Sequence, residues 1–352
     1  MRLVSPLLKH VVYPSLSRSG YLRRCASSGP AVVTYHGVLP QGYQARDIAL
    51  DGHLVTAVAF LQQIHLLKKN YNIISPDQFL GWCDGRIDLP RRSVLLTCDD
   101  GLLNTFTDML PLIQETEVPF IFFVTGASAE QVSSMLWYEG LYLWLHLADP
   151  ANLVGFPGSS AGNVNNKQVL WRQLIKQMSA LDWPARKQAL QELRTRIGIS
   201  SDWESEYSQN EALRRRFFML NAAELREVQN AGVTIGAHTV SHAMLSQMND
   251  ECAFEEMANN RARLEETLST TVWALAFPFG NAAAVGAREP ELARRAGFKC
   301  AFMNVEDTSR QHRFVLPRIH VSLRTTVAEF DAHLSGLHQS IRGKFVGAAV
   351  PA

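Results

Sequence analysis

The segment SVLLTCDDG at residues 93–101 joins a run of apolar residues directly to two aspartates and a glycine. A short, unbroken apolar run of this kind predicts a strand that is buried on both faces, as strands of parallel sheets are. Two comparable runs flank it, AVVTY at 31–35 and PFIFFVT at 119–125. A helix is expected after each of the first two strands, and the second helix, over 105–117, contains Pro111. This alternation predicts a parallel sheet with crossover helices, which is the α/β class.

The alternation breaks between about residues 127 and 218 and then resumes. The middle stretch is rich in tryptophan, glutamine and serine, and helical patches flank a Gly/Ser/Asn loop at 155–166. Large aromatic side chains dominate packing, so each tryptophan is expected to lie in a core, with a sugar-binding surface as the alternative. These tryptophans are Trp137, Trp144, Trp171, Trp183 and Trp203.

Polar side chains gather at the carboxyl ends of the expected strands. In a closed parallel barrel these ends share one rim, where active sites are built. This coincidence carries more weight than any single motif. The residues are His36, Asp99, Asp100, His238, the turn at 277–281, Arg318 and His320.

The motif HTVSH at 238–242 places two histidines four residues apart, which on a helix share one face and can bind one metal. Thr239 stands where the HExxH metalloproteases have their glutamate, so a base must come from elsewhere, and Asp99 is available. Two imidazoles and one carboxylate with open positions are typical of a catalytic metal site. Taken singly, the motifs have simpler explanations, namely an acidic pair favoured by a helix dipole and two unrelated histidines.

Three motifs follow one another in an order that resembles a known family. TCDDG at 97–101, HTVSH at 238–242 and AFPFG at 276–280 resemble the successive motifs of NodB-type polysaccharide deacetylases, carbohydrate esterase family four. YHGV at 35–38 resembles the exopolysaccharide deacetylase subgroup, in which the catalytic histidine lies on the first strand. The three motifs together are specific, although each alone is not.

The resemblance implies a distorted (β/α) barrel with fewer than eight complete units. It covers about residues 31–127 and 219–335 and leaves the middle stretch outside the shared core. The predicted parts are therefore a basic leader at 1–30, the first half of the barrel at 31–127, a helical insertion at 128–218, the second half at 219–338 and a tail at 339–352.

The resemblance also implies one divalent metal, with zinc as the first choice and cobalt, nickel or iron as alternatives that suit the same ligands. These ligands would be Asp100, His238 and His242. Asp99 would be the general base that takes a proton from a metal-activated water. The metal and the backbone N–H of Phe279, which lies between Pro278 and Gly280, would hold the oxyanion.

The sequence departs from the family's pattern in one catalytic position. The family often has an arginine that orients the base where this chain has Ala276, and our hypothesis is that Arg318 replaces it. The general acid stays open between His36, at a strand end beside a glycine, and His320, near the family's late catalytic histidine; we favour His36. Six other histidines have no partner pattern and are expected to be ordinary residues: His53, His65, His146, His312, His333 and His338.

These residues predict a hydrolase that removes N-acetyl groups from amino sugars of a polysaccharide or its precursor. Two alternatives stay open, a related amidohydrolase acting on a small cyclic or linear amide, and a barrel that binds glycan without turnover. An inactive barrel is expected to have lost one of the four residues of the site. The pair Asp99–Asp100 and both histidines of HTVSH are present, which argues against a barrel that binds glycan without turnover.

The composition bears on partners and location. A net charge of +1 with 19% charged residues argues against nucleic acid as a partner, because phosphate binding needs a concentrated basic surface. No apolar stretch is long enough to span a membrane, and no signal peptide is recognised. Residues 1–46 contain basic but no acidic side chains, so a leader helix, a contact with an anionic membrane and a transit peptide are competing interpretations. We expect a cytoplasmic protein. A more specific form of this expectation is that the protein acts at the membrane face.

Overall fold

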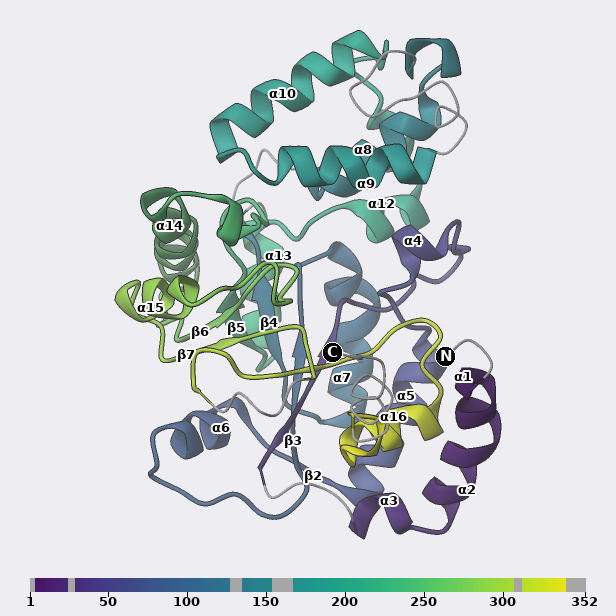
Figure 1. Cartoon of the computed structure of the whole chain (residues 1–352), viewed down its shortest axis with the longest axis vertical. Coiled ribbons are helices and arrows are strands. Elements are labelled where there is room, and N and C mark those ends of the chain that lie inside the picture. Colours follow the sequence, from purple (N-terminus) through teal and green to yellow (C-terminus); the bar gives the residue numbers. More distant parts are fainter. Residues whose placement is uncertain (1–3, 25–28, 127–134, 154–166, 307–311, 340–352) are drawn as a thin grey trace, which may run out of the picture.

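The computed structural model describes residues 4–24, 29–126, 135–153, 167–306 and 312–339 (Figure 1). Its centre is a parallel sheet in which seven strands follow the order β7-β6-β5-β4-β3-β1-β8, and β2 pairs with β3. The strands are β1 Ala31–Tyr35, β2 Asn72–Ile73, β3 Ser93–Cys98, β4 Ile121–Val124, β5 Thr234–Ala237, β6 Ala274–Ala276, β7 Cys300–Phe302 and β8 Ile319–His320. The sheet curls into a half-barrel surrounded by helices, which confirms the predicted incomplete (β/α) barrel.

Strand β3 lies inside the sheet, between β4 and β1, and is buried along its whole length. Its side chains alternate between two apolar clusters, with Leu96 in the layer under the helices and Leu95 in the interior of the curled sheet. Phe79 of α6 (Pro76–Cys83) fills part of that interior. Burial on both faces is why this strand reads as an unbroken apolar run.

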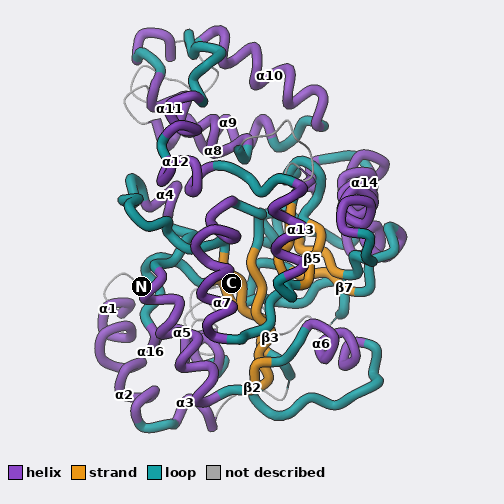
Figure 2. Tube along the Cα trace, turned by 180° about the vertical axis from the view of Figure 1, so that it is seen from behind, coloured by secondary structure: helices purple, strands orange, loops and turns teal. Residues whose placement is uncertain are grey.

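Helices cover the outer face of the sheet. Figure 2 shows them as a layer around the strands. They are α5 Ala57–Asn70, the π-helix Thr105–Met109 with α7 Leu110–Thr116, α13 Ala222–Asn230, α14 Asp250–Leu268, α15 Arg288–Arg295 and α16 Val327–Leu334. Their inward-facing residues, such as Ile64, Met109 and Leu225, join the sheet in the largest core cluster.

A second group of helices lies together at one end of the molecule, at the top in Figures 1 and 2. They are α8 Trp137–Leu147, the 3-10 helix Pro150–Leu153, α9 Lys167–Met178, α10 Trp183–Arg196, α11 Ser205–Gln209 and α12 Glu211–Phe217. The group has its own apolar cluster, which includes Leu141, Trp171 and Phe217, and it reaches the barrel through the short helix α4 (Ile48–Asp51). The division of the chain at residues 128 and 218 stays a prediction.

The N-terminal segment packs against the opposite end. It comprises α1 Val4–Leu7, the π-helix Leu8–Val12, α2 Tyr13–Arg18 and α3 Tyr21–Arg24. Tyr13 and Leu22 pack on Ala332 of α16, and Lys9 pairs with Glu329 at 2.8 Å. In the described part of the chain, no helix is both long and apolar enough to cross a bilayer.

Candidate active site

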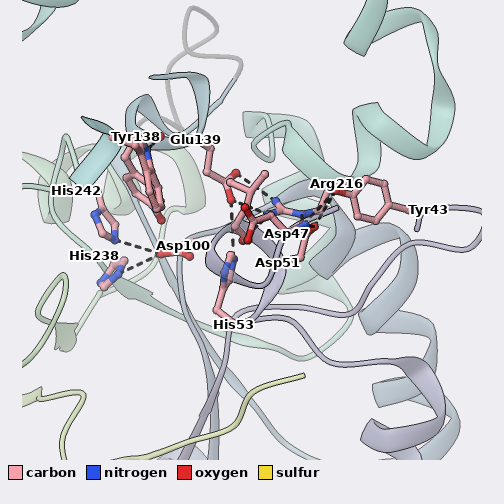
Figure 3. Close-up of polar contacts among 12 residues, drawn as sticks. Tyr43, Asp47, Asp51, His53, Asp100, Tyr138, Glu139, Arg216, His238 and His242 are labelled. Carbon is pink, nitrogen blue, oxygen red and sulfur yellow. Dashed lines mark hydrogen bonds and ion pairs between the residues drawn. The ribbon is translucent and has the colours of Figure 1, made fainter. Parts of the chain in front are cut away.

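The acidic pair and HTVSH meet at the carboxyl ends of β3 and β5. Nε2 of His238 and Nε2 of His242 lie 3.4 and 3.3 Å from Oδ1 of Asp100. All three side chains are buried, and their ligand atoms lie within 4.8 Å of one another. Figure 3 shows both imidazoles directed at the carboxylate. The structure therefore brings together the three predicted metal ligands.

The backbone that presents these ligands is a loop, not a helix. Residues 238–242 have no helical assignment, so the premise that the two histidines share a helical face is wrong. Instead, Thr239 and His242 adopt left-handed φ values of 64° and 51°, which turn both rings to the same side. Asp100 (φ 78°) and Phe279 (φ 60°) share this rare conformation. Such backbone strain in non-glycine residues concentrates at functional sites.

The cluster attracts positive charge. Both carboxylate oxygens of Asp100 are buried, and no residue in the described part of the chain forms a hydrogen bond with them. Burial of this kind disfavours a charged carboxylate unless a cation lies nearby. Burial lowers the pKa of His238, but Asp100 and the charge of Asp99 outweigh it, so this pKa is raised. At His242 the effect of burial outweighs that of Asp100, so the pKa of His242 is lowered.

The carbonyl oxygen of Ala276 orients one of the imidazoles. Nδ1 of His238 lies 2.7 Å from this oxygen, which can only accept a hydrogen bond, so Nδ1 carries the proton. The lone pair of Nε2 then faces Asp100, as in a histidine that ligates a metal. Two imidazole nitrogens and a buried carboxylate therefore fit a divalent ion of the zinc type.

The neighbouring carboxylate, Asp99, forms an ion pair with Arg318. Nη1 and Nη2 of Arg318 donate to Oδ1 and Oδ2 of Asp99 at 2.7 and 2.6 Å. Burial raises the pKa of Asp99, but the guanidinium charge and its hydrogen bonds outweigh burial and hold it below its usual value. Asp99 is therefore an ionised carboxylate with a fixed plane.

The two candidate acids lie side by side at the ends of β1 and β8. The rings of His36 and His320 are 5.1 Å apart between centroids, and among the residues that the structure describes Nδ1 of each has no hydrogen-bond partner. Burial and the neighbouring His36 lower the pKa of His320 to about 3. Gly37 (φ 123°) follows His36, and a Cβ there would lie 2.0 Å from Oδ1 of Asn104, which explains the need for glycine.

The PFG turn closes a further side of the site. The amide of Gly280 donates to the carbonyl oxygen of Pro278 at 2.6 Å, and the ring of Phe279 lies 4.9 Å from that of His242. Among the described residues the amide of Phe279 has no hydrogen-bond acceptor. A backbone donor is thus available next to a proposed metal ligand.

Sequence reasoning missed several residues that the second helical group brings to the site. The ring of Tyr138 on α8 lies 5.1 Å from that of His242. The next residue, Glu139, forms a buried ion pair with Arg216 of α12 at 2.9 Å, and Arg216 also binds Asp51 of α4 at 2.7 Å. His53, expected to be ordinary, lies between this network and the site, with Nε2 3.9 Å from Glu139 (Figure 3).

His53 also extends the row of histidines, because its ring lies 5.4 Å from that of His36. No sequence signal could have revealed the ion-pair network around Arg216, since Asp51 and Arg216 are separated by 165 positions.

Comparisons with known proteins agree with this architecture. The family model described as polysaccharide deacetylase matches residues 86–180 and 199–301, more than half of the chain. No curated protein matches the chain significantly.

Several solved structures share the fold at low sequence identity. The Streptococcus pyogenes deacetylase PplD in complex with acetate is 14% identical with a TM-score of 0.54, over 86% of this chain and 97% of that one. IcaB from Ammonifex degensii is 19% identical with a TM-score of 0.53, over 88% and 98%. The de-N-acetylase from Aggregatibacter actinomycetemcomitans is 12% identical with a TM-score of 0.52, over 86% and 99%.

Proposed function

This chain belongs to the polysaccharide deacetylase family, and we propose that it uses a divalent metal to remove acetyl groups from the amino sugars of a polysaccharide or its precursor. Membership of this family makes it an enzyme acting on N-acetyl amide bonds. The observation that carries the proposal is the convergence of Asp100, His238 and His242 beside the separate carboxylate Asp99. A binding protein without turnover has no need for that second carboxylate.

Asp100, His238 and His242 are the proposed metal ligands. When bound, a divalent ion, with zinc as the first choice, supplies Lewis acidity that polarises the acetyl carbonyl and acidifies water. The carbonyl oxygen of Ala276 keeps the proton of His238 on Nδ1, so that Nε2 is free to coordinate.

The other residues move protons and hold charge. Asp99 takes a proton from water as the water oxygen attacks the acetyl carbon, and Arg318 keeps the carboxylate in the required plane. The amide of Phe279 donates to the oxyanion that develops on the acetyl oxygen. As the C–N bond breaks, His36 protonates the departing sugar amine, and acetate is the second product.

The direct test is incubation of the chain with zinc and N-acetylglucosamine oligomers, with acetate and primary amine measured in parallel. We expect both products in equal amounts, and their loss in Asp99→Asn, which keeps the size of the side chain but removes the base. Asp84→Asn, on an exposed aspartate paired with Arg313, is the matched control and should retain activity. If zinc, cobalt, nickel and iron all fail on acetylated sugars while a cyclic amide is opened, the small-amide alternative holds instead.

We also propose that the N-terminal helices contact an anionic membrane, which would place the enzyme at a cytoplasmic membrane face. Leu7 and Val11, one helical turn apart, leave 56% and 53% of their surfaces exposed, and Lys9 and His10 lie between them in the sequence. Sedimentation with anionic vesicles tests this. We expect binding that Val11→Asp weakens, and equal recovery from anionic and neutral vesicles would refute the proposal.

A further inference from the structure

A pocket of about 220 Å³ lies within the second helical group, between α8, α10 and the turn that holds Trp203. Four of the chain's seven tryptophans line it, namely Trp137, Trp144, Trp183 and Trp203. The sequence favoured core positions for them. Trp171 of the same group meets that expectation, since it is buried and its indole N–H donates to the carbonyl oxygen of Tyr138 at 2.7 Å.

The aromatic wall is built from one face of α8. Trp137, Gly140 and Trp144 follow one another at spacings of three and four residues, which places them on the same side of the helix. The rings of Trp144 and Trp203 meet edge to face with centroids 5.6 Å apart. Gly140 has no side chain, so Trp203 can lie close to the helix, with its ring 3.7 Å from where a Cβ would stand. Trp144 and Trp203 are only partly buried.

Two indole N–H groups of this pocket are not hydrogen-bonded within the described part of the chain. Nε1 of Trp137 and Nε1 of Trp144 are both buried, and no described residue forms a hydrogen bond with either of them. A buried indole N–H normally has one, and leaving it unpaired is unfavourable. Lys187, Gln191 and Arg194 of α10 add donors to the same pocket. The lining thus combines aromatic surface with several donors, which suits a ligand that has apolar C–H faces and many oxygen acceptors.

The pocket is tied to the proposed metal ligands by direct contacts. Arg186 of α10 lies over the ring of Trp137 at 5.0 Å and donates to the carbonyl oxygen of Ser241 at 3.0 Å. Ser241 precedes the ligand His242. Tyr138, which follows Trp137, packs its ring against that of His242. Residues of the pocket wall and their direct sequence neighbours therefore contact the loop that carries the proposed metal ligands.

We propose that this pocket is a subsite for a second sugar residue of the chain that is being deacetylated. The substrate is then an oligosaccharide or polymer rather than a single amino sugar. A sugar ring presents C–H groups to the tryptophan faces, while its hydroxyl and N-acetyl oxygens accept hydrogen bonds from the indole N–H groups and from α10. The inference rests on the proposed function, because it names the size of that enzyme's substrate.

The test compares Trp144→Phe with Trp82→Phe. Phenylalanine keeps an aromatic ring and removes the indole N–H, which limits damage to the fold. Trp82 lies on α6, away from the pocket, and serves as the matched control. The substrates are N-acetylglucosamine oligomers of two to six sugars. For the wild-type enzyme we expect kcat/KM to rise with oligomer length, and Trp144→Phe should lose about 2- to 12-fold on long oligomers through KM. Trp144→Phe should leave activity on N-acetylglucosamine itself unaffected, because a single sugar has no second residue to place in the pocket.

A second measurement separates the pocket from catalysis. Calorimetric titration of the same oligomers into Asp100→Ala measures binding in a protein that lacks a proposed metal ligand. Binding that Trp144→Phe abolishes or weakens supports the subsite even if no oligomer is ever deacetylated. Equal binding by the Trp144→Phe and Trp82→Phe variants, or no binding of any oligomer, overturns the subsite, and so does a kcat/KM that is independent of length.

Discussion

Arg318 donates hydrogen bonds to both carboxylate oxygens of Asp99, with N–O distances of 2.7 and 2.6 Å, although the two residues are 219 positions apart in the sequence. Two further N–H groups of Arg318 are also used, because Nε donates to the carbonyl oxygen of Met303 and Nη1 donates to Oγ1 of Thr97. The guanidinium lies over the rings of Phe123 and Phe302. These contacts hold the guanidinium in one position, so that it can orient the carboxylate of Asp99.

Replacing Arg318 should therefore affect both stability and activity. Arg318→Ala leaves the buried carboxylate of Asp99 unpaired, which should cost about 3–5 kcal/mol of unfolding free energy. It should also raise the pKa of Asp99, because the guanidinium holds it low, so the acidic limb of the kcat/KM profile moves to higher pH. Arg318→Lys keeps the charge but not the two-point contact, so it should restore stability better than activity.

The matched control is Arg313→Ala, which removes a partly exposed arginine from its pair with Asp84 at 2.8 Å. Such exposed pairs contribute about 0–1 kcal/mol, so chemical denaturation should barely change. Full activity and an unaltered pH profile in Arg318→Ala would show that another group orients the base.

The assignment of the general acid can be decided by two alanine variants. Burial and the neighbouring His36 lower the pKa of His320 to about 3, so at neutral pH its imidazole is uncharged and lacks the acidic proton of an imidazolium. We therefore expect His36→Ala to lower kcat by about 10²–10⁴, and His320→Ala to cost much less. A larger loss in His320→Ala than in His36→Ala would reverse the assignment.

Metal content tests the ligands without knowledge of the substrate. Mass spectrometry of the purified chain should find about one divalent ion per molecule, lost in Asp100→Ala and in His242→Ala. His65→Ala, on an exposed histidine of α5, should keep the ion. A chelator should abolish activity and zinc should restore it. Equal metal content in all four proteins would contradict the assignment.

The strands of the barrel could be predicted because parallel strands are buried on both faces. SVLLT matches β3 and PFIFFVT contains β4, since no polar alternation is needed in such a sheet. The helix expected over 105–117 exists but begins as a π-helix before Pro111, whose ring and missing N–H disturb regular α-helical bonding.

The candidate site could be predicted only where residues follow strand ends. Asp100 and His238 come directly after apolar runs, so their meeting at one rim follows from the topology. The helical geometry inferred for HTVSH was wrong because two left-handed residues cannot be read from spacing. The ion pair of Glu139 and Arg216 could not be predicted, because two helices far apart in sequence bring these residues together.

Glu139 offers a prediction about pH. Burial raises the pKa of its carboxyl from 4.5 to about 7, although Arg216 opposes the shift. Between these two values the folded chain binds more protons than the unfolded chain, so the free energy of unfolding should fall as pH rises, by roughly 3 kcal/mol for this group. Glu139→Gln cannot titrate and should lose this slope, whereas Glu206→Gln, on an exposed residue of α11, should follow the wild type. Urea denaturation at intervals from pH 4.5 to 7.5 measures the difference. Parallel curves for wild type and Glu139→Gln would mean that Glu139 stays ionised throughout, held by Arg216 alone.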